Sequence, residues 1–159
     1  MRYFNTLGPV DEQKHYVVSR QELVTELLAQ IEEGHYFTIF APRQMGKTTL
    51  LRNLSDRLRG LPTYLPIVLS FQVFEQWTPA AFWQEFGHQL LRQFLSGLQA
   101  QAIPNMAQIH TLSDEHPPNS KEGFWRFFDA LHQMAPTVKV ILMIDEFDAT
   151  PQEVISSLL

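Results

Sequence analysis

The chain has 159 residues, of which 45% are hydrophobic and 18% charged, and its formal net charge at pH 7 is −5. This length predicts a single domain with a real core, and the composition excludes global disorder. The acidic balance argues against a nucleic-acid footprint spread over the surface, and the lack of cysteine excludes disulfides and cysteine–zinc sites. The chain contains no run of 18 apolar residues, so no transmembrane helix is predicted. We therefore expect a cytoplasmic protein without a membrane partner.

The N-terminal part predicts an arm followed by a helix. Residues 1–18 are polar and rich in turn formers, so we expect an N-terminal arm before a domain over 19–159. The run Ser-Arg-Gln-Glu at 19–22 has the form of a capping box. Apolar residues at helical spacing then predict a helix over about 20–33, which Gly34 ends.

A strand and a second helix follow. Residues 36–40, Tyr-Phe-Thr-Ile-Phe, are aromatic or β-branched and predict a short strand. Leucines at 50, 51, 54 and 58 predict a helix that ends before Gly60 and Pro62. The arginines of this helix are expected to be solvated rather than to contact a ligand.

The next two elements predict an edge strand and a long helix. Residues 64–71 are mostly apolar and predict a strand, which Pro66 places at a sheet edge or gives a bulge. Thr78-Pro79 is an N-cap followed by a first-turn proline. The apolar residues behind it keep helical spacing as far as Leu98, so we expect one long amphipathic helix.

The C-terminal part completes an alternation of helices and strands. Prolines and scattered polar groups predict a long loop over 101–120. Ser120 is placed to cap a helix that ends before Pro136. Residues 138–144 are nearly all apolar and predict a strand buried on both faces, and a last helix begins near 150–153. This alternation predicts an α/β fold with a parallel sheet.

A candidate phosphate-binding loop lies between the strand at 36–40 and the helix after it. Residues 41–49, Ala-Pro-Arg-Gln-Met-Gly-Lys-Thr-Thr, match the pattern G-x-x-x-x-G-K-[ST], with alanine at the first glycine position. A turn at a helix N-terminus aims backbone N–H groups at an anion, and the helix dipole adds positive charge there. The lysine would reach the terminal phosphates, and the Thr48 hydroxyl would hold magnesium. The predicted nucleotide-binding residues are Arg43, Gln44, Met45, Gly46, Lys47, Thr48 and Thr49.

Two features weaken this match. Ala41 replaces the first glycine, and Pro42 has no N–H, so phosphate donors must come from later loop positions. Short patterns of this kind also occur by chance in unrelated proteins. The predicted strand before the loop and helix after it favour the functional interpretation.

A second candidate motif ends the strand at 138–144. Asp145 and Glu146 stand at its carboxyl end, where open α/β sheets bind ligands. Asp145 suits a magnesium shell and Glu146 suits a general base, whereas the alternative is a pair of solvated carboxylates. Asp148 either belongs to the site or caps the following turn.

Both motifs together resemble the AAA-like P-loop ATPases of bacteria, of the additional-strand class close to the STAND ATPases, over roughly Tyr16 to Leu159. The resemblance implies ATP, Mg²⁺ and a three-layer α/β fold whose parallel sheet has the order 5-1-4-3-2. It also implies Walker A roles for Lys47 and Thr48, metal binding by Asp145 and catalysis by Glu146 together with Lys47. The segment 16–20 resembles one that often lies near the adenine in such proteins.

Three functions remain open on the sequence alone. The chain is an ATP-hydrolysing switch or motor for an effector domain or protein, a nucleotide-binding module without turnover, or an inactive truncated fragment. The strand expected between the phosphate-loop strand and the Asp145 strand is not found in the sequence. We therefore expect a domain truncated after Walker B, with exposed strand edges that favour homo-oligomers or low solubility.

Overall fold

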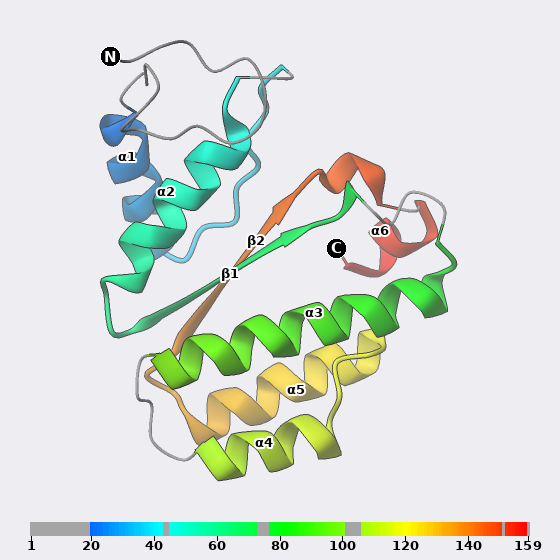
Figure 1. Cartoon of the computed structure of the whole chain (residues 1–159). Coiled ribbons are helices and arrows are strands. Elements are labelled where there is room, and N and C mark those ends of the chain that lie inside the picture. Colours follow the sequence, from blue (N-terminus) through cyan, green and yellow to red (C-terminus); the bar gives the residue numbers. More distant parts are fainter. Residues whose placement is uncertain (1–19, 43–44, 73–76, 101–105, 151, 159) are drawn as a thin grey trace, which may run out of the picture. The chain divides into compact units, whose positions relative to one another are not determined.

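The computed structural model describes residues 20–42, 45–72, 77–100, 106–150 and 152–158 (Figure 1). The chain divides into two compact units, Met1–Leu58 and Arg59–Leu159. Among the residues described, no helix combines the length and the apolar character needed to span a membrane.

The first unit contains helix α1 (Gln21–Glu32), and helix α2 (Lys47–Arg59) begins in it. Both helices lie where the spacing of leucine and isoleucine residues predicts them. The N-cap residue of α1 is Arg20, and its side chain makes no capping hydrogen bond. The predicted capping box, which has Ser19 as its N-cap residue, is therefore wrong in that position. Ser19 itself lies outside the described residues. Gly34 ends α1 as predicted: its φ is +78°, and its N–H donates to the Ile31 carbonyl over 3.1 Å.

The strand predicted at 36–40 does not form. These residues have no regular secondary structure, and the Phe40 side chain is 91% exposed. Aromatic and β-branched residues favour a strand only when a neighbouring strand completes its hydrogen bonds and a second layer covers its side chains. Within the described part of the chain, segment 36–40 has no such strand neighbour.

The second unit is built around a two-stranded parallel sheet of β1 (Tyr64–Ser70) and β2 (Lys139–Asp145) (Figure 1). The register runs from Tyr64 opposite Lys139 to Ser70 opposite Asp145. Both strands agree with their predicted ranges to within one residue at each end. The parallel pair and the helices between its strands confirm the α/β class, with two strands in the described sheet.

The outer edge of β1 explains why Pro66 is tolerated. The Thr63 carbonyl and the Phe71 N–H bond to β2, so the backbone groups of the alternate residues Pro66 and Val68 point away from it. The N–H that proline lacks is therefore not needed by the sheet. At Val68 a side chain closes the edge: Gln93 Nε2 donates to the Val68 carbonyl over 2.7 Å, and Gln93 Oε1 accepts from the Val68 N–H over 3.1 Å.

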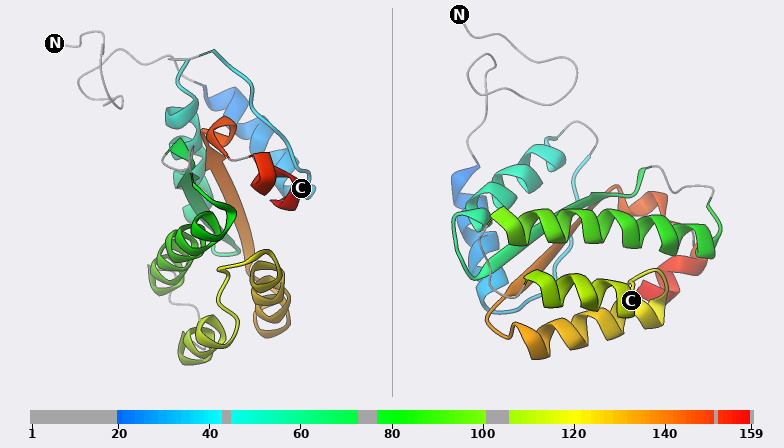
Figure 2. Two further views of the ribbon diagram at one scale, coloured as in Figure 1. Left: turned by 90° about the vertical axis from the view of Figure 1, so that its right-hand side faces the viewer. Right: turned by 60° about the horizontal axis from the view of Figure 1, so that its bottom comes forward.

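Three long helices pack together in this unit: α3 (Pro79–Ala100), α4 (Met106–Glu115) and α5 (Lys121–Met134) (Figure 2). The Thr78 hydroxyl accepts from the Ala81 N–H over 3.4 Å, and the Ser120 hydroxyl accepts from the Gly123 N–H over 3.0 Å. Both predicted caps are confirmed. A 3₁₀ turn η2 (Phe147–Ala149) and helix α6 (Gln152–Leu158) follow β2.

The long loop predicted over 101–120 is wrong, because α4 lies within it. Pro117 and Pro118 follow the helix and do not interrupt it, and Pro104 lies outside the described residues. Ile109 and Leu112, one turn apart, are both buried. Tertiary packing of these two side chains stabilises a helix whose polar composition hides it in the sequence.

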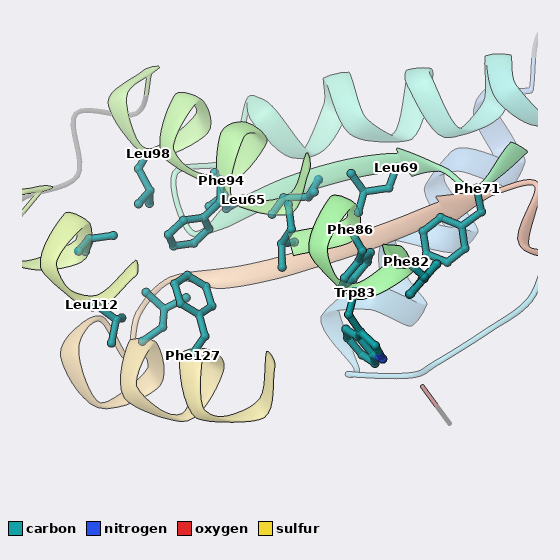
Figure 3. Packing of buried hydrophobic residues seen from close by; sticks show 14 of the residues in the cluster. Leu65, Leu69, Phe71, Phe82, Trp83, Phe86, Phe94, Leu98, Leu112 and Phe127 are labelled. Carbon is teal, nitrogen blue, oxygen red and sulfur yellow. The ribbon is translucent and has the colours of Figure 1, made fainter. Parts of the chain in front are cut away.

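The core of the second unit lies between β1 and the helices, with α3 packed on β1 (Figure 3). Leu65, Ile67 and Leu69 alternate along β1 and are buried. Strand β2 is less covered than predicted: most of its residues are half-buried. Its alternate backbone groups, at Val140, Leu142 and Ile144, point away from β1, and no further strand pairs with them in the described sheet. Because most of its side chains are only half-buried, the expectation that both faces of β2 are buried is wrong.

Candidate functional site

The predicted phosphate-binding loop ends at a left-handed glycine. Gly46 has a φ of +74°, a conformation that suits glycine because it has no Cβ. Helix α2 begins at the next residue, and its Leu50 N–H donates to the Gly46 carbonyl over 2.9 Å. The loop therefore turns directly into the N-terminus of a helix, the location at which backbone N–H groups and the helix dipole attract anions. Arg43 and Gln44 lie outside the described residues.

The ammonium group of Lys47 is held by the loop itself. Its Nζ donates to the Ala41 carbonyl over 2.7 Å and to the Pro42 carbonyl over 3.3 Å. The Met45 N–H also donates to the Pro42 carbonyl, over 3.4 Å, and closes a turn. Pro42 thus serves the loop as an acceptor, although it cannot be a donor. The half-buried lysine lies over the start of the loop, with Ala41 in place of the usual first glycine.

The two threonines after Lys47 differ in exposure. Thr48 is exposed in the first turn of α2, and Thr49 is half-buried. Met45, before the glycine, is 50% exposed. The structure therefore presents Met45, Gly46, Lys47, Thr48 and Thr49 as one continuous turn within the first unit.

Arg20 also contacts this loop, and the sequence patterns did not single it out. Its guanidinium donates from Nη2 to the Met45 carbonyl, which lies 25 positions later in the chain. A single arginine in front of a helix has no pattern that would reveal a partner so distant in sequence.

In the second unit, Asp145 is the last residue of β2 and is only 8% exposed. Its carbonyl accepts the Phe71 N–H over 2.9 Å, which fixes the end of β2 against the residue after β1. Its Oδ1 accepts the Glu146 N–H over 3.1 Å. Pairing with β1 therefore determines where this carboxylate lies.

Glu146 follows in an unusual backbone conformation. Its φ of 56° and ψ of 41° are left-handed, and no other non-glycine residue of the described chain has a positive φ. Such a conformation costs a residue with a Cβ about 1–3 kcal/mol and occurs preferentially at functional sites. The Glu146 side chain is exposed, as is that of Asp148 in η2.

Aromatic side chains pack around the end of β2, and the sequence patterns did not predict this packing. The Phe71 ring is fully buried. Its centroid lies 5.2 Å from the ring centroid of Phe82, 5.8 Å from that of Phe86 and 6.1 Å from that of Phe147. Figure 3 shows Phe71, Phe82 and Phe86 gathered at one end of the core. The Phe71 N–H bonds to the Asp145 carbonyl and Phe147 follows Glu146, so these two aromatic residues anchor the end of β2 in the core.

The residues predicted for magnesium carry suitable donors. Mg²⁺ prefers oxygen ligands, and Thr48 offers a hydroxyl and Asp145 a carboxylate. The described residues contain no group of three or more histidine, aspartate or glutamate side chains that would form a separate metal site. Lys47 and Thr48 belong to the first unit, and Asp145 and Glu146 belong to the second.

Comparison with known proteins bears on both motifs at once. Searches among curated proteins and among solved structures found no match. The family described as the AAA ATPase domain matches residues 16–159, a range that contains the loop at 41–49 and the carboxylates at 145 and 146. Since this match covers most of the chain, the protein belongs to the AAA ATPase domain family.

Proposed function

We propose that this chain binds ATP and hydrolyses it with Mg²⁺, as a switch or motor domain coupled to an effector. The observation that carries the proposal is the loop at Met45–Thr48, where a left-handed glycine leads into a helix N-terminus inside a chain of the AAA ATPase family. A loop of this geometry suits phosphate because its N–H groups and the helix dipole face an anion together.

Each residue has a proposed task. The Lys47 ammonium pairs with the terminal phosphates while its contacts to the Ala41 and Pro42 carbonyls hold it over the loop. The Thr48 hydroxyl and the Asp145 carboxylate would hold magnesium, which when bound neutralises charge on the phosphate oxygens. Backbone N–H groups from Gly46 to Thr49, with Arg43, Gln44 and Met45 earlier in the loop, would surround the phosphate chain.

Glu146 is the proposed general base. Its exposed carboxylate accepts a proton from the attacking water as the water oxygen bonds to the terminal phosphorus. The bond from that phosphorus to the bridging oxygen breaks, and the products are ADP and inorganic phosphate. The left-handed backbone at Glu146 supports this role, because strain of this kind is retained where it directs a functional side chain.

The proposal includes the P-loop sheet order 5-1-4-3-2 for the domain over 19–159, and a cytoplasmic location. The parallel neighbours β1 and β2 agree with strands 2 and 3 of that order. The open side of β2 is where the order requires another strand. We expect self-association through that edge, which size-exclusion chromatography would detect.

Two variants test the function. Lys47→Ala should weaken binding of MgATP at least about 10-fold, since a charge-assisted hydrogen bond to phosphate contributes roughly 1.5–3 kcal/mol. Arg52→Ala removes an equal charge from an exposed position of α2 and should leave affinity unchanged. Equal affinity of Lys47→Ala and wild type in isothermal titration calorimetry would refute the phosphate site.

Turnover separates an ATPase from a binding module. Glu146→Gln keeps the shape of the side chain and removes its basicity, so it should bind MgATP like wild type and release phosphate at least about 100-fold more slowly. Phosphate release at the same rate from both proteins would favour the module without turnover.

A further inference from the structure

We propose that Arg20 is a positioning residue of the phosphate-binding loop, which sets the direction of the Met45–Gly46 peptide before nucleotide arrives. The inference rests on the proposed function, since it assigns the loop's ligand to the phosphates of a nucleotide. It concerns the orientation of the loop rather than a contact between Arg20 and the ligand.

The backbone of Arg20 is fixed by α1. Its carbonyl accepts the Val24 N–H over 3.0 Å, the first hydrogen bond of that helix. Val24, Leu27 and Ile31 are buried along one side of α1, which holds the helix in place. Since the side chain does not cap its own helix, it is available to contact the loop.

The guanidinium contacts the loop at one peptide. Arg20 Nη2 donates to the Met45 carbonyl. A Cβ placed on Gly46 would lie 3.8 Å from Nη2 and 3.9 Å from Cζ of Arg20, so the guanidinium lies in ordinary contact with the side of Gly46 that has no side chain. Arg20 therefore binds the carbonyl and covers the residue that follows it.

The bond from Arg20 to the Met45 carbonyl also fixes the direction of the Gly46 N–H, which belongs to the same peptide. A trans peptide is planar, and its C=O and N–H point in opposite directions. The described residues contain no cis peptide bond, so the Gly46 N–H points away from the Met45 carbonyl and away from Arg20. This N–H belongs to the glycine at the helix N-terminus, where an anion would bind. A carbonyl released from Arg20 could rotate with its peptide and present an oxygen to the phosphates instead.

Two cations make such contacts with carbonyls of the loop. Lys47 binds the carbonyls of Ala41 and Pro42, at the beginning of the loop, and Arg20 binds that of Met45, near its end. Carbonyl oxygens repel phosphate, so contacts that engage them with cations favour the orientation in which N–H groups face the ligand. Lys47 has a second task on the phosphates, whereas the geometry assigns Arg20 to the loop alone.

The first test uses nucleotide-free protein. Hydrogen exchange at the amides of Met45 and Leu50, which donate to the Pro42 and Gly46 carbonyls, should be on the order of 10-fold faster in Arg20→Ala than in wild type, because a charge-assisted hydrogen bond that holds the loop is lost. Amides of α1 at Leu27 and Ile31 should exchange as in wild type. Arg52→Ala is the charge-matched control and should change neither set. Unchanged exchange in the loop of Arg20→Ala would overturn the proposal.

The second test separates positioning of the loop from direct contact with the nucleotide base. Calorimetry should show that Arg20→Ala binds MgATP and magnesium tripolyphosphate about 10-fold more weakly, by the same factor for both. Arg20→Lys, which keeps a charged donor on a long side chain, should recover part of the loss. A loss for MgATP alone would mean that Arg20 contacts the base, and it would overturn the positioning role.

Failure of the proposed function has a different signature. If Lys47→Ala binds both ligands as well as wild type, the phosphate site is wrong. The exchange rates of the nucleotide-free loop still decide whether Arg20 orients the Met45–Gly46 peptide.

Discussion

The left-handed backbone at Glu146 predicts an inverted order of stability between two substitutions. At an ordinary helical or extended position, glycine is less stable than alanine by roughly 0.5–1 kcal/mol because it loses more chain entropy on folding. At a φ of 56° the order should reverse, since alanine keeps the Cβ that strains this conformation and glycine does not. Glu146→Gly should therefore be more stable than Glu146→Ala.

The size of the difference follows from two opposing terms. Left-handed backbone costs a residue with a Cβ roughly 1–2 kcal/mol. The entropy penalty of glycine offsets roughly 0.5–1 kcal/mol of this, so with the middle of each range the net advantage of glycine is about 0.75 kcal/mol. For a chain of 159 residues this corresponds to a melting temperature that is higher by roughly 1–4 °C.

Thermal unfolding followed by circular dichroism measures this difference, with urea titration as an independent check. Glu146→Gln keeps the Cβ and the strain and should melt within about 1 °C of wild type, which separates the effect of backbone from that of charge. If Glu146→Ala is as stable as Glu146→Gly or more so, the backbone at this position is not strained and the reasoning is refuted.

Three further predictions concern packing and polar groups in the fold. Urea titration should show Gly87→Ala to be less stable than Gly97→Ala by about 1 kcal/mol. A Cβ at Gly87 would lie 2.6 Å from the Pro118 carbonyl oxygen, which belongs to the backbone. A Cβ at Gly97 would lie 2.5 Å from a methyl group of Leu65, which belongs to a side chain. Ser55→Ala should raise stability by about 1 kcal/mol, since the Ser55 hydroxyl is buried without a partner in the described structure; a lower melting temperature would contradict this. Gln93→Met leaves the Val68 N–H and carbonyl at the edge of β1 without the Gln93 amide. It should lower stability by about 1–2 kcal/mol and increase self-association in light scattering. An unchanged melting temperature would show that the amide contributes nothing.

Local chemistry made much of the second unit predictable. Thr78 and Ser120 cap the helices expected of them, and Pro66 lies on the edge that the strand leaves open. Each of these features depends on a few neighbouring residues, so a sequence pattern contains the whole cause.

Features that depend on distant partners were not predictable. Segment 36–40 has the composition of a strand, but a strand exists only beside another strand. Helix α4 depends on the burial of Ile109 and Leu112 by other helices.

The candidate site divides in the same way. The turn from Gly46 into α2 follows from the motif, whereas the contact of Arg20 with Met45 and the packing of Phe71 around the end of β2 arise from tertiary structure. The left-handed Glu146 could not be predicted, because glutamate has no preference for that conformation.

The register of the sheet has a consequence for how the protein folds. Every pair between β1 and β2 joins residues 75 positions apart, as from Tyr64 to Lys139. Closing a segment of that length costs about 1.6 kcal/mol more chain entropy than closing a minimal crossover of about 12 residues. The ladder should therefore form late and slowly, after the local contacts of α3, α4 and α5 have shortened the effective separation. Asp145 is held by that ladder, so its carboxylate would reach its position only at the end of folding. The time needed to form this part of the candidate site would then equal the folding time of the whole unit.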